Sequence, residues 1–157
     1  MKQNEKTNVM RVLDHKKVAY ESHSYTPDAT MTGEEIAALF GEDPAHVFKT
    51  LVTRGKTGQY FVFVVPVAAE LELKKAAKAA GEKSIEMIKQ KELLPLTGYV
   101  HGGCSPIGMK KAFKTFIHET AESLDKMFVS AGKVGFQVEL SPQDLAKTVG
   151  CGFADLV

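Results

Sequence analysis

Two neighbouring runs of β-forming residues, 47–53 and 60–67, constrain the fold of this chain more than any other feature. A polar stretch with two glycines, 54–59, separates them, which is the pattern of a β-hairpin. The apolar stretch 60–69 has about half the length that a membrane-spanning helix needs, so it predicts a buried strand and no membrane segment. We therefore expect a sheet built around this hairpin.

The remaining segments alternate between helix-like and strand-like patterns. Apolar spacing and capping residues predict helices at 8–17, 32–39, 73–80, 84–91 and 142–149. Alternating or β-branched runs predict further strands at 20–25, 115–118, 127–130 and 135–140. Strands that come singly and in hairpins, with helices between them, favour an α+β fold with a mixed β-sheet or a partly closed barrel flanked by helices. A chain of 157 residues fits one domain, so we expect a single unit over residues 1–157.

Composition narrows the class of protein. The hydrophobic fraction of 44% and the charged fraction of 25% are ordinary globular values and exclude a disordered chain. The basic N-terminus is not followed by an apolar stretch that could act as a signal peptide, so we expect a cytoplasmic protein. Cys104 and Cys151 match no metal-ligand or redox spacing, and the histidines are scattered. The sequence therefore predicts no metal and no cofactor.

Charge is unevenly distributed along the chain, although the net charge is only +1. Residues 18–48 contain six acids and no Lys or Arg, whereas residues 74–114 contain nine lysines and three acids. A lysine-rich surface of this kind could contact phosphates while the whole protein stays near neutral. Solvated helix faces explain the same pattern, and both interpretations stay open.

One lysine stands inside the first β-rich run. Side chains alternate across a strand, so Lys49 shares one face with Val47 and Leu51, and the other face is equally apolar. An ammonium group is costly to bury without a partner. Lys49 therefore reaches the edge of the sheet, pairs with a charge or lines a polar pocket. The neighbouring Thr50 is by itself explained as a good strand former.

A glycine-rich stretch at 98–111 is the second candidate for chemistry. Gly103 and Gly108 have the spacing of a phosphate-binding loop, but the residues after Gly108 are not the Lys and Ser or Thr that such a loop needs. We therefore exclude a nucleotide triphosphatase. The adjacent Gly102 and Gly103 would let a ligand approach the backbone, whose N–H groups could hold a carbonyl oxygen or a carboxylate. A plain tight turn explains the two glycines equally well.

Two other polar positions have both a functional and a structural interpretation. Cys104 lies close to His101, which could activate its thiol as a nucleophile, but a buried structural cysteine is more common. Ser130 ends a predicted strand, where its hydroxyl could point into a cleft. A hairpin turn is the alternative for Ser130.

Five motifs follow one another along the chain. They are Phe48-Lys49-Thr50-Leu51, Leu73-Lys74-Lys75-Ala76-Ala77-Lys78, Thr97-Gly98-Tyr99 with Gly102-Gly103-x-Ser105-Pro106-x-Gly108, Val129-Ser130-x-Gly132-Lys133, and Ser141-Pro142-Gln143-Asp144-Leu145. Together and in this order they closely resemble the YbaK/EbsC family, and the resemblance runs from about Met10 to the C-terminus.

The resemblance implies a single-domain trans-editing enzyme, related to the editing domain of bacterial prolyl-tRNA synthetase. Its substrate would be mischarged Cys-tRNA(Pro), with Cys-tRNA(Cys) as a second one, and prolyl-tRNA synthetase is the partner that the family implies. The thiol of the substrate cysteine is thought to attack its own ester, without a metal. The site residues that correspond to the family are the catalytic Lys49 and Gly102 and the substrate-binding Tyr25, Thr50, Gly103 and Ser130.

Two other functions fit the same sequence. One is a deacylase for another small amino acid, such as alanine on tRNA(Pro), because a small pocket discriminates poorly between small side chains. The other is a non-catalytic module that binds tRNA or a synthetase, with Lys49 as a phosphate contact. The lysine-rich region at 74–114 is compatible with both.

Overall fold

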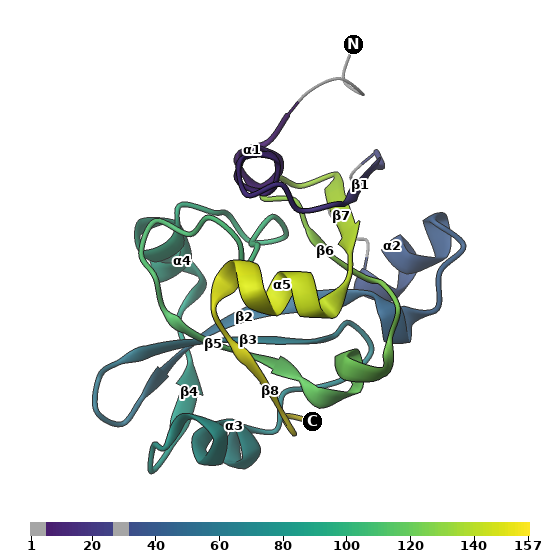
Figure 1. Cartoon of the computed structure of the whole chain (residues 1–157). Coiled ribbons are helices and arrows are strands. Elements are labelled where there is room, and N and C mark those ends of the chain that lie inside the picture. The colour runs from purple at the N-terminus through teal and green to yellow at the C-terminus, as the bar shows by residue number, and fades with distance from the viewer. Residues whose placement is uncertain (1–5, 27–31) are drawn as a thin grey trace.

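The computed structural model describes residues 6–26 and 32–157 and contains two β-sheets in this part of the chain (Figure 1). The smaller sheet is antiparallel, with the strand order β1 (Glu21–Ser24), β7 (Phe136–Leu140), β6 (Met127–Ser130). The larger sheet is mixed, with the order β4 (Ile85–Met87), β2 (Phe48–Gly55), β3 (Tyr60–Pro66), β5 (Lys114–His118), β8 (Gly152–Ala154). The predicted α+β fold with a mixed sheet is confirmed, and the two sheets do not close into a barrel within these residues.

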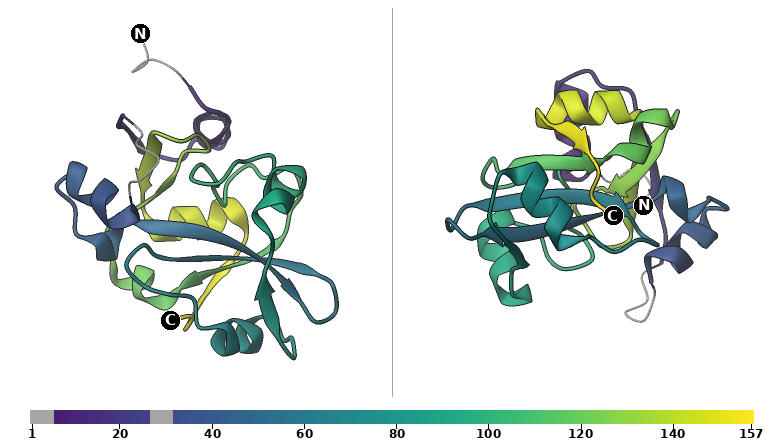
Figure 2. Two further views of the ribbon diagram at one scale, coloured as in Figure 1. Left: turned by 180° about the vertical axis from the view of Figure 1, so that it is seen from behind. Right: turned by 90° about the horizontal axis from the view of Figure 1, so that it is seen from below.

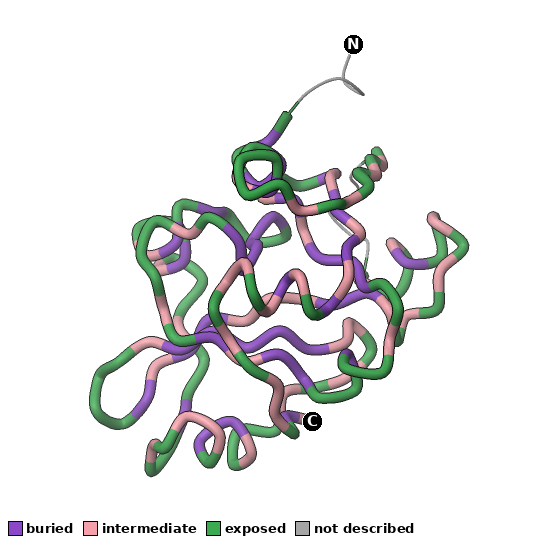
Figure 3. Tube along the Cα trace, in the orientation of Figure 1, coloured by how far each residue is buried: buried purple, intermediate pink, exposed green. Residues whose placement is uncertain are grey.

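The predicted hairpin forms the centre of the larger sheet. β2 pairs antiparallel with β3 from Phe48 opposite Pro66 to Arg54 opposite Tyr60, and β3 pairs in parallel with β5 on its other side. The residues 61–65 of β3 are all buried, which the central strands of Figure 3 show as a continuous purple tube. A strand paired on both edges and covered on both faces reads as an uninterrupted apolar run, which is the pattern of 60–69.

Helices cover the two faces of the larger sheet. α5 (Pro142–Val149) crosses one face, in front of the strands in Figure 1 and behind them in the reverse view of Figure 2. Its Leu145 belongs to the same buried core as Val62 and Val64 of β3. α3 packs its Ala76 and Ala77 on the other face, against alternate residues of β3. The helices are α1 (Asn8–His15), α2 (Gly33–Leu39), α3 (Leu73–Ala80), α4 (Gln90–Thr97) and α5 (Pro142–Val149), with 3-10 turns η2 (Pro44–His46) and η3 (Glu119–Ser123).

Capping explains where two of these helices begin. Thr32 and Glu35 form a reciprocal capping box at the start of α2, and the Ser141 hydroxyl accepts a hydrogen bond from the Asp144 N–H at the start of α5.

None of the helices in the described residues is both long and apolar enough to cross a membrane.

The predicted helix at 84–91 is wrong. The structure has β4 there and begins α4 only at Gln90, because Ile85 pairs with Gly55 at the edge of β2 and buries its side chain. The Glu92 carboxylate then accepts a hydrogen bond from the Lys89 N–H at the start of α4. The pairing demand of a neighbouring strand edge thus outweighs local helix propensity in this segment.

A buried histidine at the end of β5 holds the end of the chain after β8. Nδ1 of His118 accepts a hydrogen bond from the Leu156 N–H at 3.1 Å, and Leu156 is fully buried. Lys75 on α3 donates to the Val157 carbonyl and pairs with Asp155. Burial lowers the pKa of His118, so the neutral ring that accepts this hydrogen bond is the favoured form.

This arrangement predicts an acid-sensitive fold. The folded pKa of His118 lies below its unfolded value, so His118 contributes its full stabilisation above about pH 6.5. That contribution is lost as the pH falls toward the folded pKa, because the unfolded chain binds the proton first. Urea unfolding at pH 7.5 and at pH 5.5 measures the loss. His118→Asn should flatten this pH dependence, whereas His15→Asn, at an exposed position, should retain it. An unchanged pH dependence in His118→Asn would contradict the assignment.

Candidate active site

A cavity of about 330 Å³ lies between the two sheets, beside the first half of β2. Its walls come from β2, from the ends of β1 and β6, from β7, from the start of α2, from the middle of α4, and from the segments after β3 and α4. Its lining consists of Tyr25, Gly33, Ile36, Phe48, Lys49, Thr50, Leu51, Val67, Leu93, His101, Gly102, Cys104, Ser130 and Gln137. The fold therefore brings five of the six predicted site residues together, and Gly103 is the exception.

The cavity occupies a bare stretch of the β2 edge. On the side away from β3, β2 pairs with β4 only at Thr53–Gly55, and the preceding Val47 makes an isolated bridge to Phe128. The residues 48–51 between these pairings have no hydrogen-bonded strand partner on that side within the described chain. This explains how Lys49 and Thr50, which alternate across the strand, both line the same cavity.

Lys49 is half-buried and lines the cavity without a partner of its own. It forms no hydrogen bond or ion pair with any residue in the ranges 6–26 and 32–157. Of the three environments that the sequence left open, the paired charge is therefore excluded within these ranges. The free edge and the polar pocket are both found, and the ammonium group is available to a polar or anionic ligand.

Two buried oxygen atoms in the cavity also lack partners. Thr50 Oγ1 and Gln137 Oε1 are inaccessible to solvent and accept or donate no hydrogen bond within the described part of the chain. A buried polar group without a partner costs about 1–3 kcal/mol, so each such group in a folded protein needs an explanation. Both residues line the cavity, so a small rotation of either side chain would turn its oxygen toward a ligand.

Sequence reasoning missed Gln137, which is only 8% exposed. The available signal was a glutamine among the apolar residues of the predicted strand 135–140. Whether its side chain faces the cavity, however, depends on the register of the smaller sheet. There, Gln137 pairs with His23 on one side and with Ser130 on the other. Ser130 and Gln137 thus stand next to each other on the face that lines the cavity.

The glycine pair serves two different purposes. Gly102 lines the cavity with a φ of +87°, a backbone conformation that favours glycine, and its N–H has no hydrogen-bond partner within the described residues. Gly103 is buried and donates its N–H to the Val100 carbonyl at 3.0 Å. A Cβ on Gly103 would lie 3.0 Å from the Val134 nitrogen. Gly103 therefore closes a turn and packs against the neighbouring loop, and this geometry does not support the predicted substrate contact.

The other predicted residues are held firmly at the cavity wall. The Ser130 hydroxyl accepts a hydrogen bond from the Gly132 N–H at 3.1 Å, so Ser130 shapes the turn after β6 and lines the cavity as well. The Tyr25 ring packs edge-on against Phe40, with 5.9 Å between the ring centroids, and its N–H donates to the Gly135 carbonyl. Both side chains therefore line the cavity from elements that packing already fixes.

One group of described residues could surround a metal ion. Glu21, His23 and Glu139 each place a ligand atom within 4.8 Å of the others. Nε2 of His23 lies 2.9 Å from Oε1 of Glu139, and this hydrogen bond accounts for the arrangement at the edge of the smaller sheet. None of the three residues lines the cavity.

Comparison with known proteins identifies the family. Residues 27–148 match the family profile described as the aminoacyl-tRNA editing domain. EbsC of Enterococcus faecalis, which is named as a candidate Cys-tRNA(Pro)/Cys-tRNA(Cys) deacylase, is 42% identical over 156 residues, covering 99% of this chain and 95% of that protein. The chain belongs to the aminoacyl-tRNA editing domain family. The resemblance inferred from the sequence motifs is thereby confirmed.

Solved structures share the fold of this editing domain. A candidate trans-editing enzyme for prolyl-tRNA synthetase superposes with a TM-score of 0.81 and 23% identity, over 97% of this chain and 98% of that chain. A hypothetical protein superposes with a TM-score of 0.87 and 23% identity, over 96% of this chain and 99% of that chain. Because these identities are low, the likeness shows the fold of the editing domain and nothing about its substrate.

Cys104 is placed in the cavity wall of the editing domain but is poorly suited to act as a nucleophile. Its side chain is buried, and burial raises the pKa of its thiol to about 11. A thiol with this pKa is almost entirely protonated at neutral pH, whereas attack requires the thiolate. His101 lies at an exposed position of the same loop. The structural interpretation of Cys104 is therefore favoured.

The buried thiol predicts slow chemical labelling. In a Cys151→Ala variant, Cys104 is the sole cysteine, and its reaction with a disulfide reagent at pH 8 can be followed by absorbance. With a pKa of about 11, the thiolate fraction at pH 8 is roughly two orders of magnitude below that of an ordinary cysteine. We expect labelling of the folded protein to be at least that much slower than labelling in guanidinium chloride. Equal rates would restore Cys104 as a candidate nucleophile.

Proposed function

We propose that this editing domain is an aminoacyl-tRNA deacylase that releases cysteine from Cys-tRNA(Pro) and from Cys-tRNA(Cys). The cavity is the observation that supports this function best. It combines an ammonium group that has no partner among the described residues with two buried oxygen atoms that lack hydrogen bonds. The name of the 42% identical relative points to the same substrates.

The size of the cavity suits a small aminoacyl ester. A volume of about 330 Å³ lies at the lower end of the range for small-molecule sites. The aminoacyl group and the terminal ribose would enter it, while the body of the tRNA stays outside. Apolar walls from Phe48 and Leu93 leave room for a small, weakly polar side chain such as that of cysteine.

The chemistry that we propose uses the thiol of the substrate. The cysteine sulfur attacks its own ester carbonyl carbon, and the bond between that carbon and the ribose oxygen breaks. The thiol proton ends on the ribose hydroxyl, which leaves with the tRNA, and the cysteine leaves as a cyclic thiolactone that water then hydrolyses. This route needs no protein nucleophile, which agrees with the protonated thiol of Cys104.

The protein then acts by positioning and by electrostatics. The unpaired N–H of Gly102 is suited to stabilise the negative charge that develops on the carbonyl oxygen. The Lys49 ammonium would polarise the ester or hold the terminal ribose and its phosphate, and Thr50, Ser130 and Gln137 would orient the amino group and hydroxyls. In this scheme the ester is held in one conformation in which sulfur and carbonyl carbon are close.

The identity of the tRNA requires a second source of selectivity. The protein is small, carries a net charge of only +1 and offers a cavity that encloses little more than the aminoacyl end. We therefore include prolyl-tRNA synthetase in the proposal as the cytoplasmic partner that presents mischarged tRNA(Pro).

Removal of the cavity ammonium is the first test. Lys49→Ala should lower the rate of cysteine release from Cys-tRNA(Pro) at least about 100-fold, because the charge would be lost where the ester reacts. Lys56→Ala, at an exposed position of the β2–β3 turn, is the matched control and should keep wild-type activity. Thermal melting should show both variants folded. A Lys49→Ala variant with wild-type rates would overturn the site assignment. Parallel assays of the wild-type protein with Ala-tRNA(Pro) distinguish a cysteine-specific deacylase from one that releases alanine.

Gln137 allows activity and stability to be separated. Gln137→Leu removes a buried oxygen that has no partner, so the fold should keep or gain stability. If the oxygen binds substrate, kcat/KM for Cys-tRNA(Pro) should fall about tenfold or more. Gln143→Leu, at an exposed position on α5, serves as the control. A stable Gln137→Leu variant with unchanged kinetics would show that Gln137 is only a polar core residue.

A further inference from the structure

A second cavity, of about 230 Å³, lies where the end of α1, the end of α5 and the segment 106–113 meet. We call it the α1–α5 pocket. The lining residues that matter for its chemistry are Val12, Lys16, Met109, Lys111, Phe113 and Val149. The pocket shares no lining residue with the cavity of the candidate active site, although the segment between α4 and β5 contributes to both. It is therefore a separate place at which a ligand could bind.

The walls of the α1–α5 pocket are apolar side chains that the protein covers only in part. Val12, Met109, Phe113 and Val149 pack against the main core, yet all four are half-buried. Apolar groups that stay in contact with water in a hollow are stabilised when another apolar group replaces that water. The hydrophobic effect therefore favours an apolar ligand in this pocket.

The charge at the α1–α5 pocket has one sign. In the described chain, the charged residues that line it are Lys16 and Lys111, and no acid lines it. Both lysines are exposed, and neither side chain has a hydrogen bond or an ion pair within the described residues. The acid that precedes Lys16 on α1, Asp14, is already bonded to Lys6 and to the Tyr20 hydroxyl. Two ammonium groups are thus free to reach an anionic group on a ligand.

The inner wall of the pocket leaves few polar groups for a ligand. Thr115 is buried, and its hydroxyl donates a hydrogen bond to the Phe113 carbonyl at 2.9 Å. The Ile107 carbonyl accepts a hydrogen bond from the Tyr99 hydroxyl at 2.6 Å. A ligand with several buried hydrogen-bonding groups would lose their water without gaining partners, which is unfavourable. The part of a ligand that enters the pocket must therefore be apolar.

We propose that the α1–α5 pocket is a second binding site, for a small molecule that carries one anionic group on an aromatic or branched apolar body. The body packs against Phe113 and Val149, and the anionic group lies at the opening, where it meets Lys16 and Lys111. The volume of about 230 Å³ lies below the usual range for drug-sized ligands, about 300–1,000 Å³, so the ligand is small. The site does not depend on the proposed function.

Indole-3-acetate is a suitable probe because the chain contains no tryptophan. The indole ring can be excited selectively, and its fluorescence anisotropy rises when it binds the protein. Tryptophol has the same ring and a hydroxymethyl group in place of the carboxylate, so it reports what the charge contributes. Backbone amide shifts in NMR spectra then locate the bound probe, and they should change at 12–16, 106–113 and 148–149.

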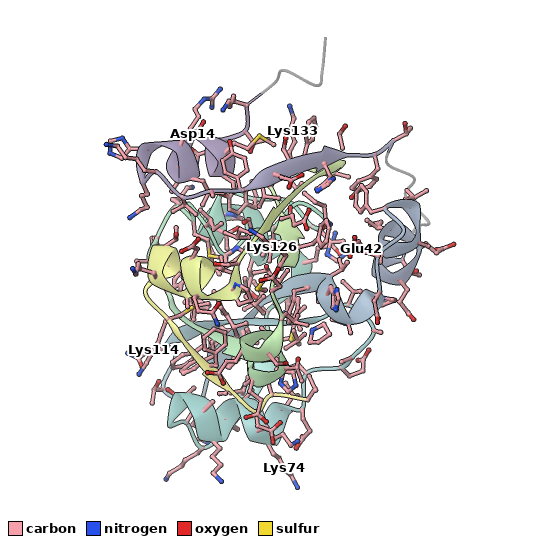
Figure 4. The ribbon with its side chains drawn as sticks, turned by 45° about the vertical axis from the view of Figure 1, so that its right-hand side comes forward. Asp14, Glu42, Lys74, Lys114, Lys126 and Lys133 are labelled. Atoms are coloured by element: carbon pink, nitrogen blue, oxygen red, sulfur yellow. The ribbon has the colours of Figure 1, made fainter. Side chains whose placement is uncertain are left out.

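The variants test the two lysines of the pocket. Lys16→Gln, Lys111→Gln and their double variant are titrated as full-length proteins, and thermal melting checks each fold. Lys74→Gln is the matched control, because Lys74 is exposed and lies on α3, at the opposite end of the molecule from Asp14 of α1 (Figure 4). Lys49→Ala reports any binding of the probe in the candidate active site.

Wild-type protein should bind indole-3-acetate with a Kd of about 1 mM or lower, as a ligand of this size allows. Each lysine substitution in the pocket should weaken binding about threefold and the double variant about tenfold. Tryptophol should bind wild-type protein about tenfold more weakly and should not distinguish the variants. Lys74→Gln and Lys49→Ala should keep wild-type affinity for indole-3-acetate.

Three results would overturn the proposal: no saturable binding, equal affinity for indole-3-acetate and tryptophol, or a loss of binding in Lys49→Ala alone. A double variant that binds the probe normally but releases cysteine slowly from Cys-tRNA(Pro) would also overturn it, because the two lysines would then contact the tRNA. We expect the double variant to keep wild-type cysteine release. A wild-type protein that binds the probe as described but releases no cysteine refutes the deacylase and leaves the second site in place.

Discussion

The pairing of β2 with β3 supports both the core and the cavity of this protein. β3 is buried along its length because it is paired on both edges and covered on both faces. β2 is paired with β3 throughout but has a second neighbour only near its ends. β3 therefore stabilises the fold, and the stretch of β2 that lacks a second paired strand leaves room for a ligand. A strand edge without a partner exposes polar backbone that can accept side chains or substrate.

The cavity concentrates polar groups that the fold itself does not satisfy. An isolated ammonium group and two buried oxygen atoms reduce stability where they stand, since other buried polar groups in proteins find partners. Such groups are retained when a ligand completes their hydrogen bonds, and preorganised groups of this kind stabilise developing charge without further rearrangement. The surrounding structure supplies the rigidity, because the walls come from two sheets and a loop held by the Tyr99 hydroxyl and the Ser105 hydroxyl.

Features set by neighbouring residues were predictable from the sequence, whereas features set by distant pairing were not. Local spacing predicts the hairpin and the caps at Thr32 and Ser141. It also singles out Lys49 as a charged residue within an otherwise apolar strand. The strand at Ile85 requires the edge of β2, which is about thirty positions earlier in the sequence, and a local pattern cannot report it. Gln137 faces the cavity only because of the register across β1, β7 and β6. Gly103 donates its N–H within a turn, and this hydrogen bond cannot be predicted from the amino-acid composition.

The close packing of Gly103 on the loop at Lys133 and Val134 has a consequence for the timing of editing. The two loops pack closely against each other beside the cavity, which restricts how far this part of its wall can open. A tRNA whose terminus is held by another protein cannot reach this cavity at the same moment. Editing is then confined to the interval between release of the charged tRNA and its next capture, and its efficiency becomes a matter of kinetic competition for one free end.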